Sequence, residues 1–194
     1  MIVAAHLLGL PDSTPNPHLW YSPRTMPAVA KAVARDLSNL DPSHAGYFAA
    51  NVRRFDASLQ PWYRAMAQFK AAYPGTPVAV TEPVGDYMLQ AAGTSILTPY
   101  TFQAEIMNGV DPSPQDVSLQ NGFFTGHKVK VFLYNQQVTD SLTESFLNLA
   151  NKEGVPVVGV YETMPTGFDY QSWMLAEVRA LQKAVADKTS TVKL

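Results

Sequence analysis

Residues 76–82 read TPVAVTE and residues 155–162 read VPVVGVYE, which look like two uses of one strand design. Each is a short β-branched run that ends in a glutamate, and a third β-branched run covers residues 129–134 and is followed by Asn135. Segments with helical spacing separate the three runs. This alternation is typical of a parallel sheet covered by helices on both faces. The sequence therefore predicts an α/β fold for this part of the chain.

Several helices around these runs are marked by signals at their ends. A proline in the first turn and a glycine stop predict a helix over residues 83–92. The capping-box pattern of residues 141–144 predicts another helix, which ends before Gly154. Apolar residues at steps of three and four predict a last helix over residues 169–187. Residues 94–127, rich in Pro, Gly, Ser and Asn, carry no pattern that assigns an element.

Two further helices are expected before the first strand. Ser22 followed by a proline, with apolar residues at helical spacing, predicts a helix that reaches Leu40. A second apolar stripe runs through residues 48–73 and predicts one long helix, which Pro61 should kink or split. Such a helix is either a core or coiled-coil arm, or a rod that joins two lobes, and the stripe does not distinguish these.

Composition excludes several classes of protein. The 194 residues are 46% hydrophobic and 15% charged, with a formal net charge of -2, so no basic surface for nucleic acid is indicated. Cysteine is absent, which excludes disulfides and leaves His, Asp and Glu as metal ligands. No apolar run approaches the roughly 18 residues of a membrane span. The first residues, MIVAAHLLGLPD, lack the basic leader and cleavage site of a signal peptide.

Polar residues end each of the three predicted strands. Glu82, Asn135 and Glu162 follow them, and ligands of open α/β sheets bind beyond the carboxyl ends of the strands. Two carboxylates and an amide are therefore expected along one edge of the sheet. The sequence has no dinucleotide-binding glycine fingerprint, no phosphate-binding P-loop, no G-x-S-x-G and no H-E-x-x-H. These absences disfavour nucleotide binding and serine hydrolysis.

His18 lies in the stretch NPHLWYSP, residues 16–23, where flanking prolines hold the chain extended. Together with Glu82 and Glu162, its imidazole forms a nitrogen and oxygen ligand set that suits zinc, manganese or iron(II). The other histidines are weaker candidates. His6 lies near the start of the chain, His44 in the first turn of the long helix, and His127 before a strand.

The stretch NPHLWYSP also resembles the Asn-Pro-His-x-Trp-x-Asp/Ser-Pro signature of the cluster A-I metal-binding solute-binding proteins of ABC importers. The likeness continues along the chain. LDPSHAGYFAANVRRFDASL (40–59) resembles the start of that family's long linking helix. VAVTEPVGDYMLQAAG (78–93) and VPVVGVYETMPTGFDYQSWM (155–174) resemble the segments that carry its third and fourth metal ligands.

The resemblance implies a metal held by His18, Glu82 and Glu162, with Asn135 orienting a carboxylate or a bound water. It implies the remainder of an N-terminal lobe over residues 1–41, a linking helix over 42–74 and a C-terminal α/β lobe over 75–194. The expected function is capture of zinc or manganese, with iron possible, outside the cytoplasm, and delivery to an ABC permease rather than catalysis.

Two departures from the family pattern bear on the metal. Glu82 stands where many zinc-type members have a histidine, and Glu162 where many have an aspartate. The family's first ligand, a histidine of an early strand, has no counterpart here. The chain is therefore expected to begin inside the N-terminal lobe, without that lobe's first strands and without the signal or lipid anchor that precedes them.

Two other interpretations stay open. Two carboxylates across a crevice can act as general acid and base, or hold a hydrolytic metal, so a hydrolase is the alternative function. A long helix with an uncovered apolar stripe can also mediate dimerisation, which is compatible with metal capture.

Overall fold

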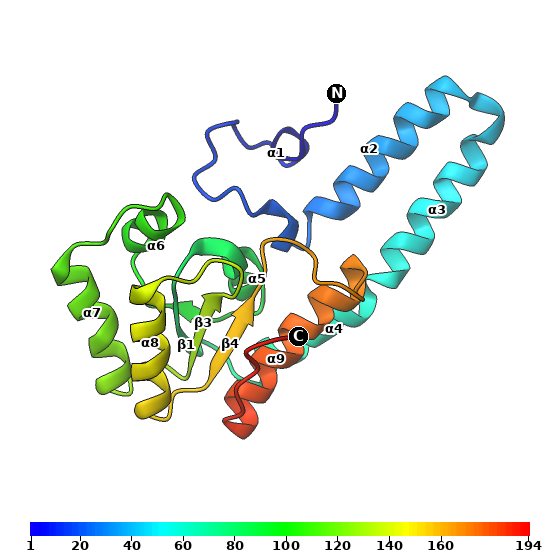
Figure 1. Ribbon diagram of the computed structural model, residues 1–194. Coiled ribbons are helices and arrows are strands. Elements are labelled where there is room, and N and C mark those ends of the chain that lie inside the picture. The colour runs from blue at the N-terminus through cyan, green and yellow to red at the C-terminus, as the bar shows by residue number, and fades with distance from the viewer.

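The computed structural model describes all 194 residues, and its centre is a four-stranded, wholly parallel sheet in the order β2-β1-β3-β4 (Figure 1). The strands are β1 (Pro77–Val80), β2 (Ser95–Ile96), β3 (Val131–Asn135) and β4 (Val157–Val160). The predicted α/β fold and parallel sheet are confirmed. Every residue of β3 and β4 is buried, as expected for strands covered on both faces.

Alternate residues of the strands face two separate cores. On one face, Val80 and Leu133 belong to a core built with α4 (Gln60–Ala72), α5 (Asp86–Ala91) and α9 (Tyr170–Asp187). On the other, Ala79 and Phe132 pack with a second group of helices (Figure 1). That group comprises α6 (Tyr100–Met107), α7 (Pro114–Thr125) and α8 (Ser141–Lys152). Because successive side chains of a strand point to opposite faces, β1, β3 and β4 each contribute residues to both cores.

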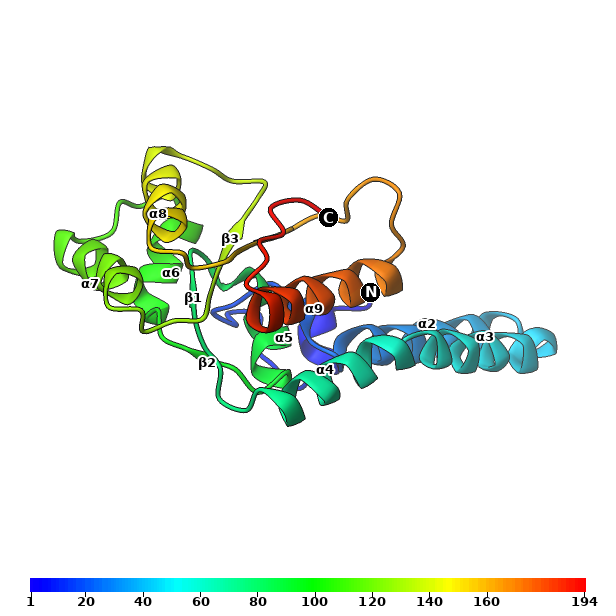
Figure 2. The same ribbon diagram turned by 90° about the horizontal axis from the view of Figure 1, so that it is seen from below.

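A helical hairpin extends away from the sheet (Figures 1 and 2). It consists of α2 (Thr25–Leu40), the 3₁₀ turn η2 (Pro42–His44) and α3 (Ala45–Ser58). The predicted long helix is divided at Leu59, two residues before Pro61, into α3 and α4. This confirms the expected break, because a proline inside a helix removes a hydrogen bond and crowds the preceding turn.

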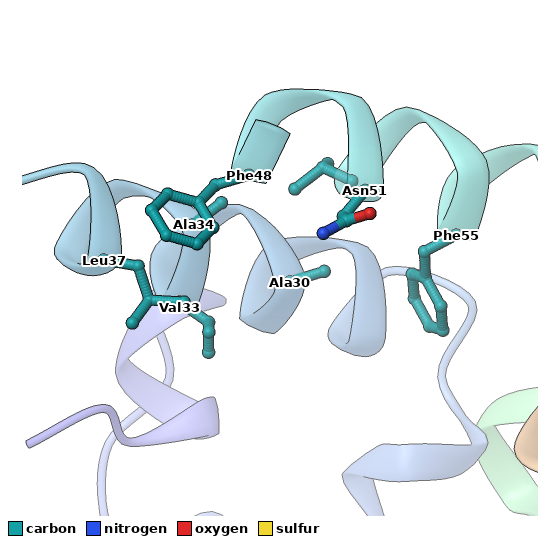
Figure 3. A pocket seen from close by; sticks show the side chains of 8 residues that line it. Ala30, Val33, Ala34, Leu37, Phe48, Asn51 and Phe55 are labelled. Atoms are coloured by element: carbon teal, nitrogen blue, oxygen red, sulfur yellow. The ribbon is translucent and has the colours of Figure 1, made fainter. Parts of the chain in front are cut away.

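The two parts of the apolar stripe have different neighbours. In α4, Trp62 and Phe69 are buried in the core beneath the sheet. In α3, Phe48 and Phe55 face α2 across a groove of about 300 Å³ (Figure 3). The stripe is therefore partly covered within the chain, and dimerisation through it stays a prediction. The proposed lobe boundaries also stay predictions; α2 ends at Leu40 and α4 at Ala72.

Some local expectations need correction. Residues 94–127, which carried no pattern, contain β2, α6 and α7. The cap of α8 is Asp140 rather than Ser141, because the Asp140 carboxylate accepts a hydrogen bond from the Thr143 amide at 2.7 Å. The helix predicted over 83–92 opens with a 3₁₀ turn, η3 (Pro83–Gly85), before α5 begins.

The ends of the chain contain little regular structure. Residues before α2 form only α1 (Ala4–Leu7) and the 3₁₀ turn η1 (Leu19–Tyr21). At the other end, the backbone around Thr191 lies along β4 and bonds to Val157 and Gly159. A Cβ on Gly159 would lie 2.2 Å from the carbonyl oxygen of Val192, so this close approach requires glycine. None of the helices has the length and apolar character needed to cross a membrane.

Candidate metal site

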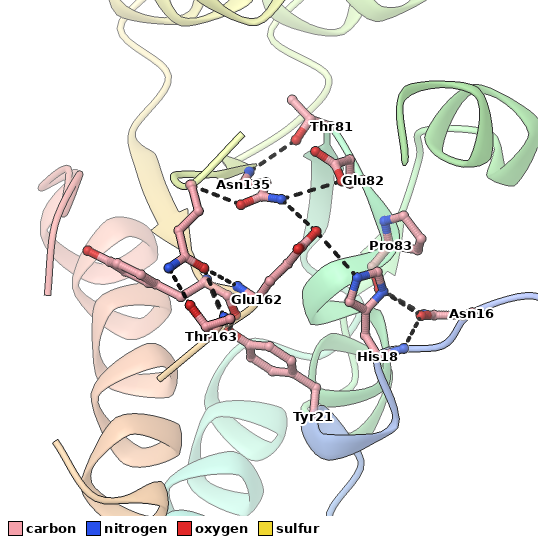
Figure 4. A network of polar contacts seen from close by, with 11 residues as sticks. Asn16, His18, Tyr21, Thr81, Glu82, Pro83, Asn135, Glu162 and Thr163 are labelled. Atoms are coloured by element: carbon pink, nitrogen blue, oxygen red, sulfur yellow. Dashed lines mark hydrogen bonds and ion pairs between the residues drawn. The ribbon is translucent and has the colours of Figure 1, made fainter. Parts of the chain in front are cut away.

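The carboxyl ends of three strands bring Glu82, Asn135 and Glu162 together (Figure 4). Glu82 lies two residues after β1, Asn135 is the last residue of β3, and Glu162 lies two residues after β4. The Asn135 amide nitrogen donates to Glu162 Oε1 at 2.9 Å and lies 3.4 Å from Glu82 Oε2. One amide therefore bridges the two carboxylates at the edge that parallel strands share.

Backbone contacts fix the orientation of the Asn135 amide. Its Oδ1 accepts a hydrogen bond from the Gln137 amide at 3.0 Å, so its Nδ2 must face the carboxylates. The backbone N–H of Asn135 donates to Thr81 Oγ1 at 3.2 Å. Both the side-chain oxygen and the backbone N–H of Asn135 are thus hydrogen-bonded.

Glu82 is a buried carboxyl group with an unsatisfied oxygen. Its side chain is 4% exposed, and its Oε1 has no hydrogen-bond partner. Burial raises the pKa of Glu82 to about 7, the nearby charges of Glu162 and Asp140 add to this rise, and the Asn135 hydrogen bond opposes it. A carboxylate in this position favours either a proton or a cation close to its free oxygen.

Glu162 is positioned by a side chain that the sequence interpretation missed. Gln137, in the loop after β3, accepts hydrogen bonds from the amides of Glu162 and Thr163, both at 2.8 Å. The Gln137 side-chain nitrogen also donates to Thr163 Oγ1 at 2.6 Å. The Glu162 side chain is 35% exposed, so the site opens to solvent at this point.

His18 is buried, and its tautomer is determined by Asn16. The Asn16 amide nitrogen donates to the Pro83 carbonyl at 2.8 Å, so its Oδ1 faces His18. That oxygen accepts from the His18 amide at 3.0 Å and lies 2.8 Å from Nδ1. The imidazole proton therefore resides on Nδ1, and the lone pair of Nε2 is available to a ligand.

The free nitrogen of His18 is directed at Glu162. Nε2 lies 3.7 Å from Glu162 Oε1, too far for a hydrogen bond (Figure 4). Burial lowers the pKa of His18, although Glu162 opposes this, so the neutral form is favoured at pH 7. Two ligand atoms of a tetrahedral zinc are about 3.4 Å apart, given metal–ligand distances of about 2.1 Å. The His18–Glu162 spacing is close to that value.

Tyrosine hydroxyl groups on three helices donate hydrogen bonds to the backbone of residues 16–23, which we call the His18 loop. Tyr87 of α5 donates to the Asn16 carbonyl at 3.0 Å, and Tyr170 of α9 donates to the Trp20 carbonyl at 2.6 Å. Tyr63 of α4 donates to the Pro23 carbonyl at 2.9 Å. The rings of His18 and Trp20 also pack in a T-shaped arrangement, with ring centroids 5.3 Å apart. The imidazole is thus presented from a loop attached to the same body as the carboxylates.

The structure does not gather every predicted ligand into one finished site. No three His, Asp or Glu side chains lie close enough together to hold an ion as a group. His18 and Glu162 are neighbours, whereas Glu82 is connected to Glu162 through Asn135. These residues fit a divalent ion by ligand type and, for His18 and Glu162, by distance.

The remaining histidines lie elsewhere. His6 pairs with Asp12 at 2.7 Å and His44 with Asp41 at 2.6 Å, in both cases with exposed side chains. His127 lies between α7 and β3, at the amino end of the strand. His127 is therefore at the opposite end of β3 from Asn135.

A further buried acid escaped the sequence interpretation. Asp86 opens α5 and is 4% exposed, its Oδ1 has no partner, and burial raises its pKa to about 7. The available signal was its place four residues after Glu82, within a segment of mainly apolar residues.

Comparisons with known proteins identify the family of the chain and structures of similar fold. The family model described as zinc-uptake complex component A, periplasmic, matches residues 4–184. No curated protein sequence matches the chain.

Solved structures of similar fold come from several bacteria. The solute-binding protein FpvC of Pseudomonas aeruginosa in complex with Mn²⁺ has a TM-score of 0.67 at 19% identity, over 89% of this chain and 62% of that one. A mutant of the laminin-binding adhesin Lmb of Streptococcus agalactiae has a TM-score of 0.68 at 18% identity, over 87% and 62%. A Mn-bound mutant of a periplasmic metal-binding protein of Candidatus Liberibacter asiaticus has a TM-score of 0.67 at 17% identity, over 88% and 63%. The chain thus spans less than two thirds of each of these structures.

Proposed function

Because the chain belongs to the family of the periplasmic component A of zinc-uptake complexes, we propose that it captures a divalent transition metal, zinc or manganese, and delivers it to an ABC importer. The place of this work is outside the cytoplasm, in keeping with the family description. The family is one of transport binding proteins and not of enzymes, so the role is capture and handover without turnover.

The observation that carries this proposal is the tautomer and the orientation of the His18 imidazole. Its proton is held on Nδ1 by Asn16, and its free Nε2 faces the Glu162 carboxylate at 3.7 Å. A metal-binding histidine commonly donates its other ring N–H to an oxygen acceptor, which fixes the tautomer and raises ligand basicity. Asn16 performs that task here.

The ligand set also supports a dication. With a neutral imidazole, the carboxylates of Glu82 and Glu162 supply two negative charges, which match the charge of the ion. Asn135 orients both carboxylates through one amide. Imidazole suits zinc, and oxygen ligands also suit manganese, so both metals are candidates and iron(II) is a third.

Calorimetric titration of the metal-stripped chain with zinc, and separately with manganese, tests the proposal. We expect saturable binding of a single ion per chain with at least one of the two metals. A parallel assay with generic ester, phosphate and glycoside substrates, in the presence of either metal, should show no turnover. Absence of binding, or metal-dependent turnover, would contradict the proposed function.

Metal affinity should depend on pH through Glu82. Burial raises the pKa of this group to about 7, and a ligating carboxylate must lose its proton. Below this pH each ion displaces a proton, so zinc affinity should fall by up to about tenfold per pH unit as the solution is acidified. Titrations at about pH 6 and about pH 8 measure the change. The Glu82→Gln variant is the control, because its weaker binding should lose this part of the pH dependence.

A further inference from the structure

A single phenol connects the two backbone segments that carry His18 and Glu162. Tyr21, three residues after His18, is fully buried, and its hydroxyl donates to the Tyr161 carbonyl at 2.9 Å. The same oxygen accepts a hydrogen bond from the Tyr161 amide at 3.2 Å. Both backbone groups of the residue before Glu162 therefore bond to one side chain of the His18 loop. Figure 4 shows the Tyr21 ring directed from that loop toward the segment of Glu162.

A third contact of this phenol involves Glu177 of α9. The Tyr21 oxygen lies 3.1 Å from Glu177 Oε1, which also accepts from the Trp173 indole N–H at 3.1 Å. A phenol has one proton to donate, and the nearer of its two acceptors is the Tyr161 carbonyl, at 2.9 Å against 3.1 Å for Glu177 Oε1. With that proton on the carbonyl, a hydrogen bond between the two side chains requires a proton on Glu177. Glu177 is 1% exposed, and burial raises its pKa to about 8, which agrees with a protonated carboxyl group at pH 7.

We propose that Tyr21 is a positioning residue of the metal site, which sets the separation of His18 and Glu162 by binding the Tyr161 backbone, while the Glu177 carboxyl group contacts the same hydroxyl. This inference rests on the proposed function. Tyr21 itself does not touch the ion.

Other tyrosines near the site have a different connection. Tyr63, Tyr87 and Tyr170 bind carbonyls of the His18 loop to helices. Of the four phenols, Tyr21 is the one bonded to the segment that carries Glu162. Removing its hydroxyl should release one ligand-bearing segment from the other, whereas removing the hydroxyl of Tyr170 should loosen the loop alone.

The Tyr21→Phe variant tests the proposal, with Tyr170→Phe as the matched control. Loss of a group that orients a metal ligand typically weakens metal binding by about 10- to 100-fold, and we expect a loss in this range for zinc in Tyr21→Phe. Tyr170→Phe loosens the His18 loop but leaves the Tyr161 backbone bound to Tyr21, so it should lose less zinc affinity than Tyr21→Phe.

An effect of Tyr21 on the stability of the fold can be distinguished from an effect on the positions of the metal ligands. If Tyr21 merely stabilises the fold, Tyr21→Phe will lower the melting temperature while the zinc affinity of the folded protein stays unchanged, and the proposal is then wrong. Hydrogen exchange in the metal-free chain gives a second measure: amides of residues 161–163 should exchange faster in Tyr21→Phe than in Tyr170→Phe. Equal exchange would overturn the proposal even if the unaltered chain bound no zinc, a result that would count against the proposed function alone.

Discussion

The His18→Ala variant is expected to lose more zinc affinity than the about 10- to 100-fold that removal of an orienting partner costs. His18 is the one nitrogen donor among the proposed ligands, and its Nε2 is already free and directed at Glu162. Alanine removes the donor itself. The remaining carboxylates offer only oxygen, so the loss should be larger for zinc than for manganese, which is well served by oxygen ligands.

The fold of the His18 loop should survive this substitution. The residue 18 amide, which alanine keeps, donates to Asn16 Oδ1 at 3.0 Å, and the Asn16 amide still donates to the Pro83 carbonyl. The measurement is calorimetric titration with each metal, alongside a melting curve that reports the folded fraction. His44→Ala is the control, because His44 is an exposed histidine paired with Asp41. Equal zinc affinity of His18→Ala and the unaltered chain would exclude His18 as a ligand.

The second large effect concerns Glu177 and the stability of the metal-free chain. Burial raises the pKa of Glu177 from its ordinary 4.5 to about 8, so the folded chain retains a proton that the unfolded chain loses. Stabilisation from this group is complete below about pH 4.5 and is lost as the pH rises through about 8. Over that window the free energy of unfolding should decrease by up to about 1.4 kcal/mol per pH unit on account of Glu177.

Glu177→Gln should remove this contribution. The amide cannot ionise, so the free energy of unfolding should fall less steeply with pH than in the unaltered chain, and the variant should be the more stable of the two near pH 9. Burial also raises the pKa values of Glu82 and Asp86 to about 7, so some decrease with pH will remain in both proteins. The difference between the two curves isolates Glu177.

Denaturant unfolding at several pH values, with a chelator present, measures this difference. Glu144→Gln provides a matched control, since Glu144 is an exposed glutamate on α8. Its curve should follow that of the unaltered chain. Parallel curves for Glu177→Gln and the unaltered chain would show that Glu177 is ionised in the folded protein and that its contact with Tyr21 has another origin.

Helices and strands could be predicted where the residues that define them are close to one another in the sequence. The break before Pro61 follows from proline geometry, and the last helix follows from the apolar spacing of residues 170–185. The sequence assigned no element to residues 94–127. Within this segment, β2 has only two residues and is defined by its pairing with β1, not by a pattern of its own. Asp140 replaced Ser141 as a cap because either side chain can cap a helix, and the path of the preceding loop selects one of them.

Part of the site was also within reach of the sequence. The strand-end rule placed Glu82, Asn135 and Glu162 along one edge, and the structure brings them together there. A signal for Glu177 was present as well, since it lies on the apolar face of α9 four residues from both Trp173 and Leu181. An acid at such a position indicates a buried carboxyl group that needs a partner.

The sequence by itself determined β1, β3, β4 and the helices α2 to α5, α8 and α9, the edge at which polar groups gather, and the family signature around His18, because each depends on residues near one another along the chain. Only the tertiary structure decided the tautomer of His18, the bridge that Asn135 makes, and the bond from Tyr21 to a residue 140 positions away. Those features depend on which backbone atoms approach a side chain in space. Such approaches are set by the packing of α4, α5 and α9 around the sheet, and a one-dimensional pattern does not encode them.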